Sequence, residues 1–102
     1  MQIILENCKN LLKEYYGSQF HSLLLYGSTV RHQDDTISDI DMLLILEKPF
    51  EYFYELRKIT EILYPIQLES KQLISVKPTS KIEFEEGSIQ LYRNAKREGQ
   101  IL

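Results

Sequence analysis

Hydrophobic residues at the start of the chain follow a helical spacing and then a strand-like run. The apolar positions of the first segment recur at steps of three and four: Ile4, Cys8, Leu11, Leu12 and Tyr15. This is the spacing of one face of an α-helix, so we predict a helix over residues 3–15, closed by Gly17. The next segment, "FHSLLLYG" (20–27), is short and mostly apolar, which predicts a buried strand.

A second apolar run follows a polar middle section. "STVRHQ" (28–33) can begin a helix, with Ser28 as its N-cap, and "DDTIS" (34–38) predicts a polar loop. "DIDMLLIL" (39–46) is apolar at consecutive positions beyond Asp41. Such a strand is covered on both faces, so we predict that it lies in the centre of the sheet.

The second half of the chain alternates between the two periodicities again. In the segment 50–63 the apolar positions share one helical face: Tyr52, Leu56, Ile59 and Leu63. We predict a helix there that Pro65 ends. In the segment 66–78 Ile66 and Leu68 alternate with Gln67 and Glu69, which predicts a third strand.

The C-terminal segment predicts a helical turn at 80–87 and a last helix at 88–99, which Ser88 caps and Gly99 ends. Helices and strands therefore alternate along the chain. This order indicates an α/β (α+β) fold with a small mixed β-sheet flanked by helices. A length of 102 residues fits one domain, 1–102.

Composition excludes several classes of function. Hydrophobic residues make up 43% and charged residues 26% of the chain, which is ordinary for a globular domain. A net charge of −3 gives no reason to expect direct nucleic-acid binding or a membrane surface, and no apolar run approaches a membrane span of about 18 residues. The N-terminus has no signal-peptide pattern, and the single cysteine, Cys8, is expected to be a core residue. We therefore expect a cytoplasmic protein.

Two aspartates at the start of the second strand are the first candidates for chemistry. Side chains two apart on a strand share a face, so Asp39 and Asp41 would point the same way, about 7 Å apart. Two like charges at this distance repel and raise each other's pKa. A divalent cation would relieve that repulsion, and Mg²⁺ prefers carboxylate oxygens and is often shared with substrate phosphates.

The turn before the aspartates offers partners for phosphate. Gly27 lets a ligand approach the backbone, Ser28 can donate a hydrogen bond to phosphate, and Arg31 can reach the same anion. A phosphate cradle facing two metal-binding carboxylates suits phosphoryl or nucleotidyl transfer. Arg31 facing solvent is an equal alternative, and His32, Asp34 and Asp35 are interpreted as surface or turn residues.

The segment "GSTVRHQDDTISDID" resembles the G-S-x(10)-D-x-D signature of the minimal nucleotidyltransferases, members of the polymerase-beta-like superfamily. Gly27-Ser28, ten residues and Asp39-Ile40-Asp41 fit it without a gap. The segment "YRNAKREGQIL" (92–102) is similar to the closing helix of these domains. The resemblance covers nearly the whole chain.

This resemblance implies the nucleotidyltransferase fold and the transfer of a nucleoside monophosphate, AMP from ATP, to an acceptor hydroxyl, with two Mg²⁺ ions as cofactors. It also implies that Gly27 and Ser28 contact the triphosphate and that Asp39 and Asp41 bind metal. A third carboxylate on a neighbouring strand is usual in the family. The third predicted strand has no aspartate, and Glu69 is the best candidate for this catalytic and metal-binding role.

Small members of the family commonly act beside a HEPN-type toxin. The resemblance therefore implies an antitoxin that attaches AMP to a tyrosine of its partner. An antitoxin that works by binding alone and a nucleotidyltransferase for a small molecule remain as alternatives. Two surfaces are candidates for contacts: the aromatic residues Tyr52, Phe53 and Tyr54 for a partner protein, and the stretch of Tyr92, Arg93, Lys96 and Arg97 for a triphosphate or a partner protein. For the second of these, a solvated helix face is the default.

Overall fold

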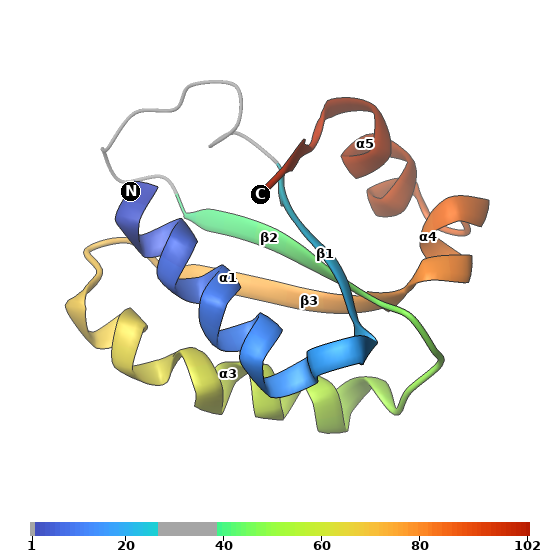
Figure 1. Ribbon diagram of the computed structural model, residues 1–102. Coiled ribbons are helices and arrows are strands. Elements are labelled where there is room, and N and C mark those ends of the chain that lie inside the picture. The colour runs from blue at the N-terminus through green and yellow to red at the C-terminus, as the bar shows by residue number, and fades with distance from the viewer. Residues whose placement is uncertain (1, 27–38) are drawn as a thin grey trace.

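The computed structural model describes residues 2–26 and 39–102 of the chain (Figure 1). Its elements are, in order, α1 (Gln2–Tyr16), the short 3-10 helix η1 (Gly17–Gln19), β1 (Phe20–Tyr26), β2 (Ile40–Leu46), α3 (Tyr52–Glu69), β3 (Ile74–Ser80), α4 (Lys81–Glu86), α5 (Gln90–Glu98) and β4 (Gln100–Ile101). The helix start predicted at 28–33 and the loop predicted at 34–38 lie outside the described residues.

The strands form one mixed sheet in the order β3-β2-β1-β4. β1 runs antiparallel to β2 and β4, whereas β2 and β3 run parallel, with α3 as the crossover between them. The predicted α+β class, the mixed sheet and the inner position of β2 are confirmed. β4 was not predicted, because two residues carry no readable periodicity; its pairing with β1 continues in the bond from the Leu102 N–H to the Leu23 carbonyl (2.9 Å).

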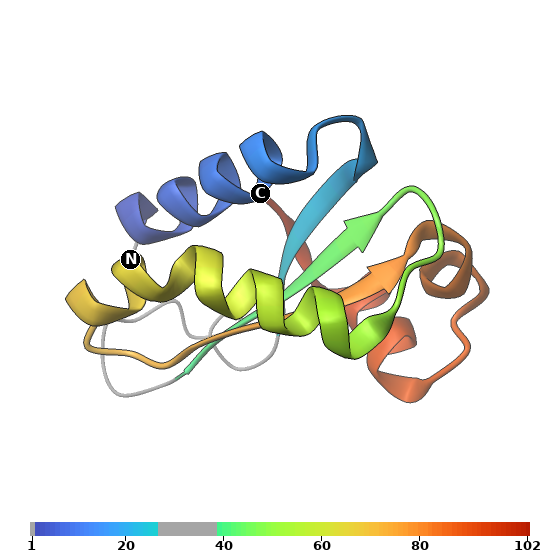
Figure 2. The same ribbon diagram turned by 90° about the horizontal axis from the view of Figure 1, so that it is seen from below.

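Helices cover both faces of the sheet, and the alternation of β2 explains why (Figures 1 and 2). Met42, Leu44 and Leu46 belong to the core under α1 and α3. Leu43 and Ile45 belong to the smaller core under α4 and α5. β2 therefore buries both of its faces, as its continuous apolar run predicted.

Helix α1 packs on the sheet through a stripe rotated slightly from the predicted one. Leu5, Cys8 and Leu12 are its buried residues, whereas Leu11 and Tyr15 are exposed, so the prediction was wrong at these two positions. Cys8 is a core residue as predicted, and burial raises the pKa of its thiol to about 11.

The observed end of α3 and the observed start of β3 contradict two predictions. Pro65 does not end this helix, which continues to Glu69, and the predicted strand over 66–78 begins only at Ile74. The missing proline N–H removes one helical hydrogen bond. The last turn is retained because Ile66 still packs against the core under the helix.

A side-chain clamp also stabilises the last turn of α3. Gln67 donates from Nε2 to the Gln72 carbonyl (2.9 Å) and accepts from the Ile74 N–H at Oε1 (2.7 Å). The Ser70 hydroxyl donates to the same Gln72 carbonyl (2.9 Å). Helix end and strand start are therefore joined by bonds between residues five and seven apart in sequence, which the alternation of Ile66 to Glu69 did not reveal.

The C-terminal helices begin and end at identifiable residues. The Ser80 hydroxyl caps α4 by accepting from the Glu83 N–H (3.2 Å). The predicted cap at Ser88 was wrong, because Ile89 occupies the N-cap position of α5 without a side-chain bond. The predicted end at Gly99 is confirmed, and its N–H donates to the Ala95 carbonyl (2.7 Å).

Helix α3 presents aromatic side chains to solvent. Phe53 and Tyr54 are 73% and 53% exposed, and Tyr52 is 36% exposed.

Over the described parts of the chain, no helix has both the length and the apolar character needed to cross a membrane.

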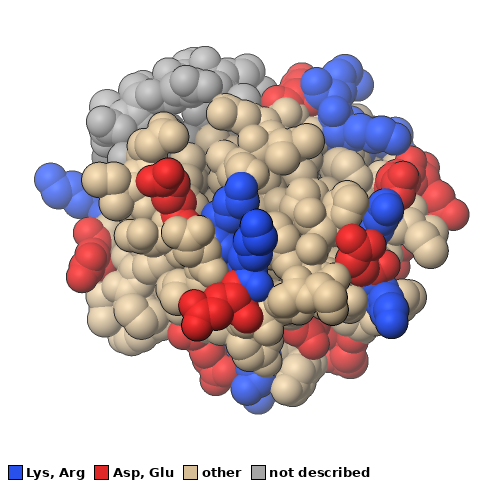
Figure 3. All heavy atoms as spheres, in the orientation of Figure 1, with Lys and Arg blue, Asp and Glu red and all other residues tan. Residues whose placement is uncertain are grey.

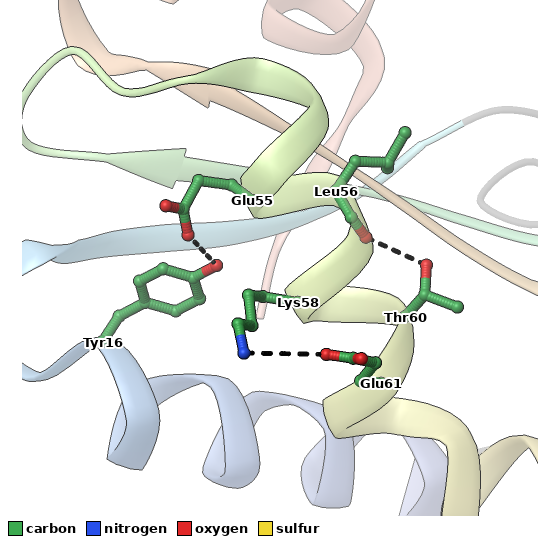
Figure 4. A network of polar contacts seen from close by, with 6 residues as sticks. All are labelled: Tyr16, Glu55, Leu56, Lys58, Thr60 and Glu61. Atoms are coloured by element: carbon green, nitrogen blue, oxygen red, sulfur yellow. Dashed lines mark hydrogen bonds and ion pairs between the residues drawn. The ribbon is translucent and has the colours of Figure 1, made fainter.

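A part-buried hydrogen bond joins the last residue of α1 to the beginning of α3 (Figure 4). The Tyr16 hydroxyl donates to Glu55 Oε1 at 2.8 Å. Burial, and then this carboxylate, raise the pKa of Tyr16 far above its ordinary value. Figure 4 also shows two contacts within α3, from Thr60 to the Leu56 carbonyl and between Lys58 and Glu61.

Replacing Tyr16 with phenylalanine is expected to lower the free energy of unfolding by about 1 kcal/mol, because a partly buried bond to a carboxylate is lost while the ring remains. Tyr15→Phe is the matched control, since Tyr15 is exposed and lies beside Tyr16 in the chain. Urea denaturation followed by circular dichroism measures both. Equal midpoints for the two variants would show that the bond contributes nothing.

Candidate functional site

Asp39 and Asp41 lie where β2 begins. Asp39 directly precedes the strand and is exposed, while Asp41 is its second residue and is half-buried. The alternation of strand side chains puts both on the same face of the sheet, about 7 Å apart along the strand. Beyond them on that face, Leu43 and Ile45 are buried under α4 and α5. The aspartates therefore occupy the open end of an otherwise apolar surface.

The register of the sheet identifies the neighbours of Asp41. Tyr26 on β1 and Ser75 on β3 stand directly beside it. Lys77, two residues after Ser75 and therefore on the same face, stands beside Leu43 and is exposed. A hydroxyl group thus lies on each side of Asp41, and an ammonium group lies one step further along β3.

Burial and neighbouring charges shift the pKa values of two groups at this site. The pKa of Asp41 is raised, first by burial and then by the negative charge of Asp39, while the positive charge of Lys77 opposes this rise. The pKa of Tyr26 is raised to about 12, first by burial and then by Asp41. Asp41 therefore carries its charge at a cost, which a bound cation would lower.

The chemistry of this donor set fits a divalent cation shared with a substrate. Two carboxylates on one face, one of them partly desolvated, are the ligands that Mg²⁺ takes from protein when phosphates and water supply the rest. Among residues 2–26 and 39–102, no three acidic, histidine or cysteine side chains gather into a metal-binding group. The two aspartates are thus the carboxylates through which the described part of this site would bind metal.

Glu69 is not where the sequence analysis placed it. It is the last residue of α3 and exposed, rather than a residue of the third strand. The strand beside β2 offers Ser75 opposite Asp41, and Glu69 does not join the two aspartates in a metal-binding group of the described residues. The strand assignment failed because residues 66–69 have alternating hydrophobicity but stay helical.

The other predicted site residues lie in the segment between β1 and β2. Gly27, Ser28 and Arg31, together with His32, Asp34 and Asp35, are outside the described residues. Their roles toward a triphosphate remain predictions from the sequence. The described ends of that segment lie at neighbouring strands: Tyr26 is the last residue of β1, Asp39 directly precedes β2, and Tyr26 pairs with Asp41.

The basic stretch of α5 has structural partners. Arg93 donates to the Gly87 carbonyl (2.6 Å) and to Gln90 (2.9 Å), and Lys96 donates to the Glu85 carbonyl (3.2 Å). Tyr92 is buried in the core under α4 and α5. The bonds to Gly87 and Glu85 hold α5 against the end of α4, so Arg93 and Lys96 have partners within the protein, and Tyr92 does not belong to a solvated helix face.

The surface of the described residues has charged side chains and, beside α1, a hollow. The face shown in Figure 3 carries acidic and basic side chains intermixed, without a patch of one sign among its described residues. A hollow of about 370 Å³ lies between α1 and the end of the chain, where Leu5, Lys9, Lys13 and Leu102 are among its lining residues. Neither Asp39 nor Asp41 lines this hollow, so it is separate from the candidate site at the start of β2.

A comparison with solved structures finds a similar fold elsewhere. The chain matches a chain of a crystal structure of a mutant MntA-HpeT toxin-antitoxin, with a TM-score of 0.62 and 14% sequence identity. The match covers 95% of this chain and 70% of the other. The two chains therefore share a small mixed α+β fold. No family model matches the sequence, and a search of curated proteins finds no match. At this identity the likeness establishes the fold, and function must be argued from the site.

Tyr26, Ser75 and Lys77 are site neighbours that sequence reasoning did not identify. A signal for two of them was present, because Ser75 and Lys77 alternate with Ile74 and Val76 in "ISVK". That alternation predicts that they share a face, but only the register between β2 and β3 shows that this is the face of Asp41.

Proposed function

We propose that this protein is a Mg²⁺-dependent nucleotidyltransferase that moves AMP from ATP to an acceptor hydroxyl. The observation that carries the proposal is the pair Asp39 and Asp41, which shares one sheet face at the open end of β2. The resemblance of "GSTVRHQDDTISDID" to the minimal nucleotidyltransferases supports it. The fold shared with a toxin-antitoxin component is consistent with it.

In this reaction the acceptor oxygen forms a bond to the α-phosphorus while the bond to pyrophosphate breaks. Bound Mg²⁺ would neutralise charge on the triphosphate and orient it for in-line displacement. Asp39 and Asp41 would hold the metal, and the half-buried position of Asp41 strengthens its interaction with a cation relative to open water. Gly27, Ser28 and Arg31 are proposed to bind the phosphates.

The proposed acceptor is a tyrosine of a HEPN-type toxin, which makes this chain the antitoxin of a cytoplasmic toxin-antitoxin pair. The fold shared with the MntA-HpeT toxin-antitoxin structure supports a toxin as the partner. The exposed aromatic side chains of α3, with Phe53 73% exposed, are candidates for the surface that binds it.

Incubation of the purified protein with α-labelled ATP, Mg²⁺ and its toxin tests the enzymatic proposal. We expect label on the toxin that survives denaturing electrophoresis, and none when Asp41→Asn replaces the wild type. Removing Mg²⁺ with a chelator is expected to abolish labelling. A toxin that binds the protein tightly but acquires no label would contradict the proposal.

A second candidate function rests on a specific observation. β3 presents Ser75 and Lys77 beside Asp41 instead of a carboxylate, so the described residues offer no third acid to accept the acceptor's proton at this strand. The lack of a third acid on β3 is consistent with an antitoxin that neutralises its partner by binding, with weak or no nucleotidyl transfer. The double variant Asp39→Asn/Asp41→Asn separates the two functions in cells: full protection against the toxin favours binding, and lost protection favours transfer.

A further inference from the structure

Lys77 is placed by the sheet at the edge of the proposed metal site. It lies two residues after Ser75, the register partner of Asp41, and stands beside Leu43. Its side chain is exposed. From this position the aliphatic part can lie along the sheet while the ammonium group stays in water near the aspartates.

Lys77 lies on the same sheet face as the carboxylate that would bind metal. Its register partner, Leu43, is two residues after Asp41 on β2, so the side chains of Lys77 and Asp41 point to one face on adjacent strands. Lys77 makes none of the ion pairs found among the described residues, which join His21 to Glu47, Lys58 to Glu61 and Arg97 to Glu98. Among the described residues its ammonium group is therefore part of none of these pairs, and the register of β2 and β3 places Lys77 near Asp41.

A positive charge beside a cation site has opposite effects on the two components of a metal-nucleotide complex. It repels a divalent cation that arrives alone, because like charges interact unfavourably at this range. It attracts a triphosphate, for which lysine serves as a compact point charge. A site with this composition takes up metal and nucleotide together more readily than metal alone.

We propose that Lys77 is a positioning residue that couples the two binding events: its ammonium group weakens the binding of a divalent cation alone and contacts the phosphates of a nucleoside triphosphate that arrives with the metal. This inference rests on the proposed function, since it assigns the metal to Asp39 and Asp41. It adds a phosphate-binding residue on β3 to the nucleotide site.

Replacing Lys77 with methionine is expected to shift the two affinities in opposite directions. Binding of Mn²⁺ alone should tighten about fivefold, because a nearby positive charge is removed. Binding of a non-cleavable α,β-methylene analogue of ATP, measured with Mg²⁺ present, should weaken about tenfold, because a charged contact to phosphate is lost. Isothermal titration calorimetry measures both, and circular dichroism checks the fold.

Two further variants make the test decisive. Lys77→Arg keeps the charge and is expected to stay near the wild type in both titrations. Lys48→Met makes the same substitution at an exposed lysine beyond the other end of β2 and is expected to change neither. Loss of both affinities in Lys77→Met, or no change in either, would overturn the role of Lys77. A wild-type protein that binds neither Mn²⁺ nor the analogue would instead overturn the proposed function, and the role of Lys77 with it.

Discussion

Asparagine in place of Asp41 is expected to reduce nucleotidyl transfer by about a thousandfold or more, and Asp39→Asn should do the same. Each change removes one of the two carboxylates that we propose bind Mg²⁺. A thousandfold loss corresponds to about 4 kcal/mol of transition-state stabilisation. Single-turnover transfer of label from ATP measures it, with toxin or another acceptor in excess.

Glu47→Gln is the matched control for this pair of variants. Glu47 follows β2 at its other end and lies 3.1 Å from His21. Like the aspartates, Glu47 has a carboxylate near an end of β2, but at the opposite end of the strand. Its transfer rate should equal that of the wild type. A rate for Asp41→Asn within a few-fold of the control would contradict the assignment of the site.

The same Asp41→Asn variant should be at least as stable as the wild type at neutral pH. The folded-state pKa of Asp41 is raised by burial and by Asp39, so ionising it costs the folded state more than the unfolded state. This destabilisation is absent below the ordinary carboxyl pKa and grows as pH rises through the raised one. Urea midpoints compared at pH 4 and pH 8 should therefore favour the variant more at the higher pH.

The second large effect concerns stability rather than activity. Leu44→Ala is expected to lower the free energy of unfolding by about 2–5 kcal/mol, the usual range for a buried leucine. Leu44 has no exposed surface and stands between Leu23 on β1 and Pro78 on β3. Because small domains are stable by only about 5–15 kcal/mol, this one change removes a large part of the total.

Leu68→Ala provides the comparison, since Leu68 on α3 is 68% exposed. It should change stability by no more than about 0.5 kcal/mol. Urea denaturation of both variants, followed by circular dichroism, gives the two values. Similar losses for Leu44→Ala and Leu68→Ala would show that β2 does not form the centre of the core.

The elements that the sequence predicted well share a strong local pattern. "DIDMLLIL" is continuously apolar beyond Asp41, and the structure buries both faces of β2 between helices. Helix periodicity likewise located α1 and most of α3. These patterns are readable because side-chain direction repeats every 2 or 3.6 residues within one element, without reference to the rest of the chain.

The segment from Pro65 to Leu73 shows where local patterns mislead. Proline commonly ends a helix, and "IQLE" alternates as a strand does. The structure keeps the helix because Ile66 packs into the core and Gln67 bonds to the chain that leads into β3. These contacts are tertiary, and they outweigh one missing helical hydrogen bond.

The candidate site was likewise predictable from the sequence only in part. The sequence by itself determined that Asp39 and Asp41 share one face at the mouth of a buried strand, because that follows from the period of a single strand. Only the tertiary structure decided what stands beside them: Tyr26 and Ser75 next to Asp41, Lys77 one step further, and Glu69 on a helix instead of the neighbouring strand. Register between strands depends on how separate segments pair across the sheet, and no periodicity within one segment specifies it.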